Sequence, residues 1–416
     1  MTAAHIPDTA VGKRLAAVLF VSTSLGSAAL ITNSIVTPLV AGELTGTAAY
    51  AGIPGTLLLI GAASSAYPGS LLMQRYGRRP GLAGAFLVGS LAVAFGALAI
   101  VQQLWFLFLF AALLVGVARG IIDQSRYAAA DANPPATRAR AISTVVFAST
   151  VGAVVGPLLV GPAGDYAARA YKYSALTGPL AVGCVCFLLG GLVLWMLLRP
   201  DPRDIDRAYS GQNHHSEITI PTGSAFRQLF RHPAVSVAAI SILASQVIME
   251  LVLTVTSVHM HQNQHSLSDI SFIFMMHTLG MYGLSFVTGT VTDRIGRSAS
   301  IVVGAVILIC GCLIAPIYDS IAGLSVSVFL IGLGWNYCYI GGSSLLSTHG
   351  DPAGRNQTQG AIDFGVNLLS AIASFSTGFI LAWWGFGVLC AIATIVACVP
   401  IVVTVLRRSA LQGQPV

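Results

Sequence analysis

Long apolar segments dominate this chain, and they constrain its fold more than any other feature. A bilayer core about 30 Å thick needs roughly 20 apolar residues in a helix that rises about 1.5 Å per residue. The sequence contains about twelve such runs, and in each run the apolar residues are continuous. Continuous runs indicate helices, because the strands of a membrane barrel alternate apolar and polar residues. We therefore expect an all-α membrane protein with twelve transmembrane helices.

The composition agrees with a polytopic membrane protein. Only 9% of the residues are charged and 55% are hydrophobic, so a soluble domain would lack the charge to cover its surface. The first apolar run is too long for the core of a signal peptide, and we expect it to remain as a span. The expected spans are 14–38, 47–73, 81–101, 104–126, 139–163, 175–198, 234–258, 269–291, 299–317, 321–346, 359–383 and 385–406.

The distribution of Lys and Arg predicts the orientation of these spans. If both termini are cytoplasmic, eighteen of the 21 basic residues lie on the inner side, and only Arg169 and Lys172 lie outside. Arg119 falls within a span. Cytoplasmic loops carry an excess of basic residues, so this asymmetry indicates a cell-membrane protein with both termini inside. The net charge of +6 then reflects topology and contact with the lipid bilayer, and we expect no nucleic-acid partner.

One polar insertion divides the chain into two halves of six spans. Residues 199–232 are rich in charged residues and follow the sixth span. We expect an N-terminal six-helix bundle over 1–198, a cytoplasmic linker over 199–232 and a C-terminal six-helix bundle over 233–416. The seven cysteines all lie in apolar spans, where thiols usually serve as packing residues, so we expect no metal site, and no cofactor is indicated.

A short charged sequence occurs once in each half. GTVTDRIGRS, residues 289–298, aligns with SLLMQRYGRR, residues 70–79, when Gly296 is set against Gly77. Each copy follows the second span of its half and precedes another apolar run. Repetition at equivalent positions indicates two structurally related halves that use the same tight loop.

These loops resemble a motif of the major facilitator superfamily, G-x-L-A-D-R-x-G-R-R, which joins the second and third helices of each half. The second copy matches at Gly289, Asp293, Arg294, Gly296 and Arg297. The first copy has Gln74 where Asp is usual and Ser70 where Gly is usual, and it matches at Arg75, Gly77, Arg78 and Arg79. The resemblance implies two pseudo-symmetric six-helix bundles and a cytoplasmic gate at these loops. In the family the Asp caps a neighbouring helix and pairs with Arg, and Gln74 cannot supply that charge.

The fifth span resembles an element of the drug/proton antiporters in this family, G-x-x-x-G-P-x-x-G-G. Gly152, Gly156 and Pro157 match it, whereas Val160 replaces the first glycine of the final pair. Glycines four residues apart allow close helix contact, and an internal proline bends a helix. The same pattern occurs in membrane helices for packing alone, so both interpretations stay open. An Arg that is usual in the fourth helix of these antiporters is absent at the expected position, Ala112.

Ionisable residues inside the spans are candidates for coupling transport to protons. A charge at the bilayer centre costs about 2.5–3.5 kcal/mol on insertion scales, so such residues need a partner or a function. Glu250 shares one helix face with Gln246 and Thr254, and a carboxyl group that has lost hydration there would exchange protons near neutral pH. A structural role is the alternative for each candidate. The proton-coupling candidates are Glu250, Asp363, Asp123 and His277.

A substrate cavity is implied by the resemblance, in which the first, fourth, seventh and tenth helices surround the centre. On these helices the candidates are Asn33, Arg119, Gln246, Trp335, Asn336 and Tyr339. Arg119 and Asp123 are four residues apart and can pair with each other. Trp335 can stack on a flat or apolar cargo, or simply pack within the bundle.

The sequence favours a secondary transporter over the other classes of membrane protein. We found no nucleotide-binding loop, no zinc-protease motif and no nucleophile elbow, so we do not expect an enzyme. The expected function is proton-coupled export of a small amphipathic molecule by alternating access in a monomer. Proton-coupled uptake of a small metabolite remains the alternative, and sodium could replace the proton. The cargo and the stoichiometry are not readable from the sequence.

Overall fold

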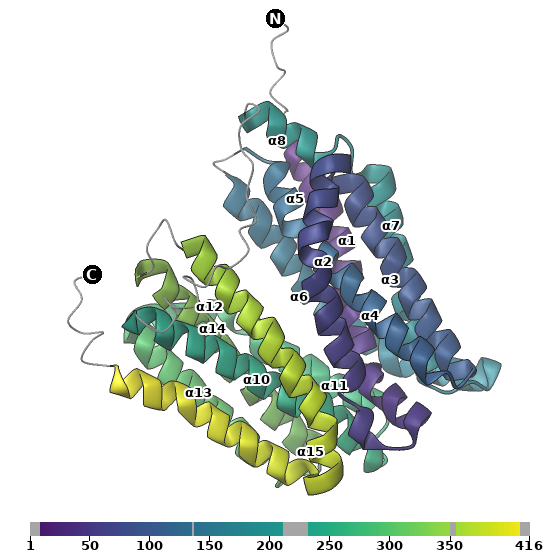
Figure 1. Ribbon diagram of the computed structural model, residues 1–416, viewed down its shortest axis with the longest axis vertical. Helices are drawn as coiled ribbons and strands as arrows, with labels where there is room; N and C mark the ends of the chain where they lie inside the picture. The colour runs from purple at the N-terminus through teal and green to yellow at the C-terminus, as the bar shows by residue number, and fades with distance from the viewer. Residues whose placement is uncertain (1–8, 135–136, 211–231, 350–354, 408–416) are drawn as a thin grey trace, which may run out of the picture. The chain divides into compact units, whose positions relative to one another are not determined.

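The computed structural model describes residues 9–134, 137–210, 232–349 and 355–407, which are folded into helices joined by short turns (Figure 1). The chain divides into two compact units. The first comprises Met1–Leu44 and Leu57–Glu217, and the second comprises Thr45–Thr56 and Ile218–Val416. The linker predicted over 199–232 falls largely at 211–231, outside the described residues, and its boundaries remain a prediction.

Helices of the first unit correspond to the six apolar runs of the N-terminal half. They are followed by a short amphipathic helix, α8, which Figure 1 shows at the end of this unit where α1 begins. The helices are α1 (Thr9–Thr45), α2 (Ile53–Tyr76), α3 (Arg78–Val101), α4 (Trp105–Ile122), α5 (Ser125–Asp131), α6 (Arg138–Tyr171), α7 (Thr177–Leu197) and α8 (Pro202–Ser210).

Helices of the second unit follow the remaining apolar runs. The short segment before α2 also belongs here, because Ser374 Oγ donates a hydrogen bond of 3.1 Å to the carbonyl oxygen of Gly52. The helices are η1 (Ala48–Tyr50), α10 (Pro233–Gln262), α11 (Leu267–Thr278), the π-helix η3 (Leu279–Gly283), α12 (Ser285–Ile295), α13 (Arg297–Ile314), α14 (Ile321–His349) and α15 (Arg355–Leu406).

The number of spans agrees with the sequence. Within the described ranges, ten helices are long and apolar enough to cross a membrane, and the bent run α11–η3–α12 makes an eleventh. α15 is one of the ten, but a straight helix of its 52 residues would be about 78 Å long, far more than a bilayer core. Its backbone leaves the helical conformation at Gly385, where φ is 81°, and Figure 1 shows the chain reversing within α15. Two spans in α15 bring the total over the described residues to twelve.

The two repeated loops adopt the same backbone turn. Gly77 between α2 and α3 has a φ of 108°, and Gly296 between α12 and α13 has a φ of 89°. A side chain at a positive φ clashes with the backbone, so glycine suits a turn this tight between two long helices. The internal repeat in the sequence is therefore also a repeat in structure.

Packing inside the first unit depends on glycines that face aromatic rings. Phe86 on α3 and Phe187 on α7 lie edge to face, with ring centroids 6.0 Å apart. A methyl group at Gly190 would lie 2.5 Å from Phe86, and one at Gly89 would lie 3.1 Å from Phe187. A glycine on each helix thus packs against the aromatic ring of the other helix. Close packing of this kind is the main attraction between helices in a lipid environment.

The eighth span differs from its prediction as one unbroken helix over 269–291. Its backbone passes through η3 and bends by 44° between Gly283 and Ser285. α11 begins at a capping box, in which Ser266 Oγ accepts from the amide of Asp269 and the Asp269 carboxylate accepts from the amide of Ser266. Hydropathy could not reveal the bend, because the apolar run continues through it without a polar interruption.

Candidate functional site

Three of the residues predicted to line a cavity lie together in the second unit. The indole Nε1 of Trp335 on α14 donates a 3.0 Å hydrogen bond to Oε1 of Gln246 on α10. The Trp335 ring also stacks on Tyr339, with centroids 4.8 Å apart and planes 9° apart. Trp335 is buried at 8% exposure, whereas the Tyr339 side chain is 45% exposed. The buried indole therefore holds the orientation of an exposed phenol ring.

Tyr282, which the sequence did not single out, completes this group. It lies on η3, and its ring meets Trp335 edge to face with centroids 6.1 Å apart. Its side chain is 40% exposed. The glycines on either side of it, Gly280 and Gly283, could have indicated the break in the sequence, since paired glycines in an apolar helix often mark a kink or a close approach. We call Tyr282, Trp335 and Tyr339 the aromatic cluster.

Gln246, Trp335 and Tyr282 each lie near the middle of a span. Gln246 lies near the centre of the 30-residue α10, and Trp335 lies near the centre of the 29-residue α14. By a rise of about 1.5 Å per residue, both positions are about 20 Å from the start of their helices. Tyr282 lies at the break in the middle of the α11–α12 span. All three residues are thus placed at mid-depth, where transporters of broken-helix design bind their substrates.

Glu250 lies one helical turn beyond Gln246 on the less buried face of α10. Gln246, Glu250 and Thr254 are all partly exposed, whereas Ile248 and Val252 between them are fully buried. The stripe predicted from the sequence therefore exists as a continuous face of α10.

Asn336 is the neighbour of Trp335, but it points into the bundle and is only 3% exposed. Its Nδ2 donates to the carbonyl oxygen of Met281 and, at 2.9 Å, to Ser285 Oγ. Its Oδ1 accepts from the hydroxyl of Thr288. A helix break frees backbone carbonyls that must find new donors within the membrane. Asn336 satisfies the Met281 carbonyl and so supports η3, while its contact with cargo stays a prediction.

His277 and Asp363 were the other coupling candidates in this half. His277 is 2% exposed, and its Nδ1 lies 3.0 Å from the carbonyl oxygen of Val328 on α14. No described group hydrogen-bonds its Nε2. This contact joins α11 to α14. The side chain of Asp363 lies outside the described residues, and its role remains a prediction.

The candidates of the first unit are divided between its interior and its surface. Asn33 on α1 is buried at 5% exposure. Arg119 Nε and Asp123 Oδ2 lie 3.8 Å apart, and their side chains are 42% and 58% exposed. Exposed ion pairs of this geometry contribute little to stability. The predicted self-pairing of Arg119 and Asp123 is thus present, and both charges remain accessible.

The repeated loop of the first unit is capped by a residue that the sequence did not single out. Asp201, just before α8, accepts hydrogen bonds from the backbone amides of Arg78 at 3.0 Å and Arg79 at 2.9 Å. These amides begin α3, where unpaired N–H groups and the helix dipole favour a carboxylate. A methyl group at Gly77 would lie 2.4 Å from Asp201, so the close approach also requires glycine.

Further contacts attach α8 to the same loop. Arg203 on α8 donates to the carbonyl oxygens of Gln74 at 3.3 Å and Arg75 at 3.0 Å. Arg203 thus binds the C-terminal end of α2, where carbonyl groups lack helical partners. The loop also contacts α5, because Arg78 Nε lies 2.8 Å from Asp131 Oδ2. The Gln74 side chain itself is exposed. No carboxylate stands at position 74, where the family motif has Asp. The carboxylate of Asp201 caps the start of α3.

The second copy of the loop is more open. Asp293, Arg294 and Gly296 are exposed, whereas Gly289 and Arg297 are partly buried. No described atom lies within 4 Å of a methyl group built on Gly296. The two copies therefore share a backbone turn and differ in what covers it.

The fifth-span element packs α6 against α1. A methyl group at Gly152 would lie 2.1 Å from the carbonyl oxygen of Ser24, and one at Gly156 would lie 2.8 Å from that of Ala28. Hydroxyl groups of α1 bond across the same contact, including Ser27 Oγ to the carbonyl oxygen of Ser149 at 2.7 Å. The two glycines allow the helix backbones to touch, and Pro157 follows directly inside α6.

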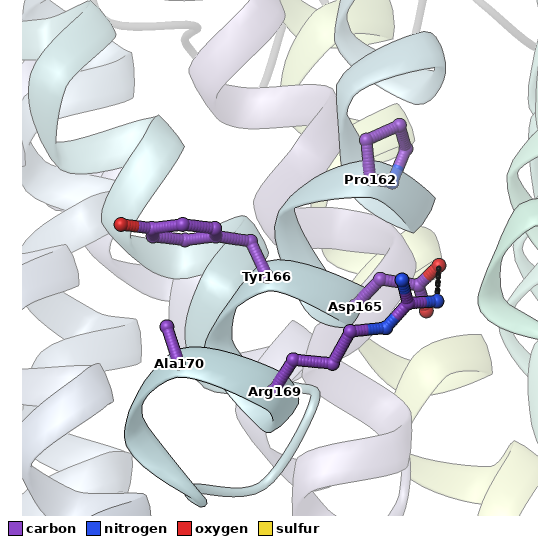
Figure 2. Close-up of a pocket in the computed structure, with 5 residues that line it drawn as sticks. All are labelled: Pro162, Asp165, Tyr166, Arg169 and Ala170. Atoms are coloured by element: carbon purple, nitrogen blue, oxygen red, sulfur yellow. Dashed lines mark ion pairs between the residues drawn. The ribbon is translucent and has the colours of Figure 1, made fainter.

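A surface cavity of about 490 Å³ lies near the end of α6, away from these groups. Figure 2 shows the Asp165 carboxylate and the Arg169 guanidinium pointing toward each other, with Tyr166 on the other side. The Asp165–Arg169 ion pair measures 3.6 Å and is mostly exposed. None of the residues predicted for function lines this cavity. It therefore has no part in the candidate site.

Comparison with known proteins extends the resemblance to nearly the whole chain. The chain is 34% identical over 404 residues to the uncharacterized MFS-type transporter YdeG of Bacillus subtilis (strain 168), covering 95% of this chain and 92% of the relative. It is 27% identical over 374 residues to the riboflavin transporter RfnT of Brucella anthropi, covering 90% of each.

Solved structures share the fold at low sequence identity. The nucleoside transporter NupG aligns with a TM-score of 0.71 and 14% identity, covering 97% of this chain and 100% of that one. An inward-facing bacterial homolog to the human lysosomal transporter Spinster aligns with a TM-score of 0.68 and 15% identity, covering 96% and 95%. The model of the family described as Major Facilitator Superfamily matches residues 17–263 and 238–415. The chain is therefore a multi-pass membrane transporter with the two-part fold of this family, and it belongs to the Major Facilitator Superfamily.

Proposed function

We propose that the protein is a secondary active transporter that exports a small amphipathic molecule in exchange for protons. The observation that carries the coupling part of this proposal is the position of Glu250, whereas export is favoured by the fifth-span element of Gly152, Gly156 and Pro157. Glu250 lies on the partly exposed face of a membrane-spanning helix, one turn from Gln246, which in turn holds Trp335. Ionisable side chains within transmembrane helices mark substrate or proton pathways. Reversible protonation of Glu250 would change the charge beside the cargo.

Alternating access supplies the rest of the mechanism. In this scheme the two six-helix halves rock about a central site, so that the site opens to one side of the membrane at a time. The basic loops, including Arg78 and Arg294, would lie in the cytoplasm together with both termini, as the positive-inside pattern predicts. Gly152 and Gly156 allow close contact of α6 with α1, and Pro157 gives α6 a position at which it can bend.

Proton-coupled uptake of a small metabolite is a second candidate. The relative in Brucella anthropi is named a riboflavin transporter, which favours a metabolite as cargo and makes riboflavin the first compound to assay. The proposed coupling group, Glu250, would serve both directions. The two candidates differ in phenotype, since loss of an exporter raises sensitivity to its cargo, whereas loss of an uptake system removes growth on it.

Transport by purified protein in liposomes tests the coupling. A pH difference of one unit supplies about 1.4 kcal/mol per proton. This free energy can sustain about a tenfold concentration difference of a neutral cargo that is exchanged for one proton. We expect wild-type protein to build such a difference for a compound from an amphipathic panel, and Glu250→Gln to lose it. Exchange of labelled for unlabelled cargo without a gradient should persist in the variant, because exchange requires no net proton movement.

The matched control is Glu43→Gln. Glu43 is an exposed carboxylate at the end of α1, where it accepts a 2.7 Å hydrogen bond from Ser174. This variant removes one negative charge far from the middle of the span and should keep gradient-driven transport. If Glu250→Gln accumulates cargo as well as Glu43→Gln does, the coupling role of Glu250 is wrong.

A further inference from the structure

The aromatic cluster of Tyr282, Trp335 and Tyr339 indicates what kind of molecule the second unit binds. Two of its rings, Tyr282 and Tyr339, are exposed at 40% and 45%. Tyr282 lies at the break in the middle of its span, and Tyr339 lies one helical turn, about 6 Å, beyond the centre of α14. Elsewhere in transmembrane helices, tyrosine concentrates at the two membrane interfaces, where its hydroxyl reaches water. Two exposed phenols within about one helical turn of mid-depth are therefore unusual for lipid contact and suit a polar surface that contacts cargo.

The cluster is rigid before any ligand arrives. The Trp335 indole is fixed at its edge by Gln246, 3.0 Å away, and on its face by Tyr339, whose ring is nearly parallel. Neither aromatic ring can turn without losing the stack. Rigid aromatic side chains give affinity at low entropic cost, because little motion is left to lose on binding.

The broken helix places Tyr282 beside this stack. Gly280 brings η3 against α14 so closely that a methyl group there would lie 2.3 Å from the carbonyl oxygen of Phe329. Asn336 then holds the Met281 carbonyl. π-helical turns are rare, and they occur frequently at functional sites. The close approach at Gly280 and the hydrogen bond from Asn336 support η3, and they hold the Tyr282 ring at 72° to the Trp335 ring.

The chemistry of this surface fits a flat, π-rich molecule with polar edges. Two tyrosine rings at a steep angle offer one face for stacking and one edge for an edge-to-face contact. Gln246 keeps two amide N–H donors beside the oxygen that accepts from Trp335, and Glu250 adds a carboxyl group one turn away. A flexible acyl chain would gain nothing from the fixed ring geometry, and a sugar alone would not use the apolar faces.

We propose that the cargo carries a planar heteroaromatic ring that stacks on Tyr339, meets Tyr282 at its edge and hydrogen-bonds Gln246. This inference rests on the proposed transport function, and it adds the substrate class. Trp335 is a positioning residue, since it is buried behind Tyr339.

Equilibrium binding separates this inference from the coupling mechanism. Purified full-length protein in lipid nanodiscs is titrated with riboflavin, whose fluorescence falls when its ring system stacks on an aromatic side chain. Stacking of a base on an aromatic residue contributes about 1–3 kcal/mol, which corresponds to about a 5- to 150-fold change in affinity. We expect Tyr339→Ala to weaken binding within this range and Tyr339→Phe to stay within about twofold, because the ring remains. Tyr318→Ala, at a 55% exposed tyrosine of the same unit outside the cluster, should match wild type.

Competition identifies the part of the ligand that is recognised. Lumichrome, which is the ring system alone, and adenosine should displace riboflavin, whereas ribitol, which is the sugar-alcohol tail alone, should not. Equal affinity of Tyr339→Ala and wild type, displacement by ribitol, or no binding of any of the three flat probes would each overturn the inference. Binding is measured without a gradient, so transport of a non-planar cargo could still support the proposed function after such a result. Conversely, Tyr339-dependent binding without proton coupling would sustain the inference alone.

Discussion

The attachment of α8 to the first repeated loop can be tested through Asp201. Its two carboxylate oxygens accept from the amides of Arg78 and Arg79 at 3.0 and 2.9 Å. Loss of a helix cap costs about 0.5–2 kcal/mol, and loss of a negative charge at a helix N-terminus costs a further amount of about 0.3–1 kcal/mol. Asp201→Ala should therefore destabilise the first unit by about 1–3 kcal/mol. Asp201→Asn should lose roughly half as much, because its amide retains one acceptor oxygen.

Thermal unfolding of the purified protein measures this loss. For a unit of this size, 1 kcal/mol corresponds to about 2–4 °C, so Asp201→Ala should unfold about 2–12 °C lower than wild type at a fixed scan rate. Asp204→Ala is the matched control. It removes a carboxylate three residues away, on α8, but Asp204 is 56% exposed and pairs only with the adjacent Arg203 among the described ion pairs. Equal unfolding temperatures for Asp201→Ala and Asp204→Ala would refute the capping role.

Two further substitutions test the helix contacts. Gly152→Val should abolish transport and lower the yield of folded protein, because even its first side-chain carbon would lie 2.1 Å from the Ser24 carbonyl oxygen. Its control is Gly84→Ala, which should transport normally because a methyl group at Gly84 meets no described atom within 4 Å. Asn336→Leu should destabilise the second unit by about 1–3 kcal/mol, since the Met281 carbonyl would lose its buried donor, and unfolding of the variant at wild-type temperature would contradict this role.

The sequence predicted those features that depend on local pattern. Apolar runs located the spans, and the repeated loop with its glycines predicted related halves. The resemblance to the family also placed Gln246, Trp335 and Tyr339 near one another, as the second unit shows.

Features that depend on contacts between distant residues were missed. Asp201 lies 123 residues along the chain from Arg78, so no local pattern connects it to the start of α3. The π-helix at Tyr282 depends on the approach of α14 and on a donor from Asn336. The role of Asn336 beside the cargo stays a prediction, and the hydrogen bonds that its buried side chain makes inside the bundle could not be read from the sequence.

Proton movement driven by cargo tests the central proposal most directly. Liposomes containing the protein and a pH-sensitive dye are given a concentration gradient of a transported cargo, with no pH difference at the start. Wild-type protein should then move protons as cargo flows, Glu43→Gln should behave in the same way, and Glu250→Gln should transport cargo with no change in internal pH. Cargo flux without proton movement in the wild type, or proton movement retained in Glu250→Gln, would contradict the proposed coupling at Glu250.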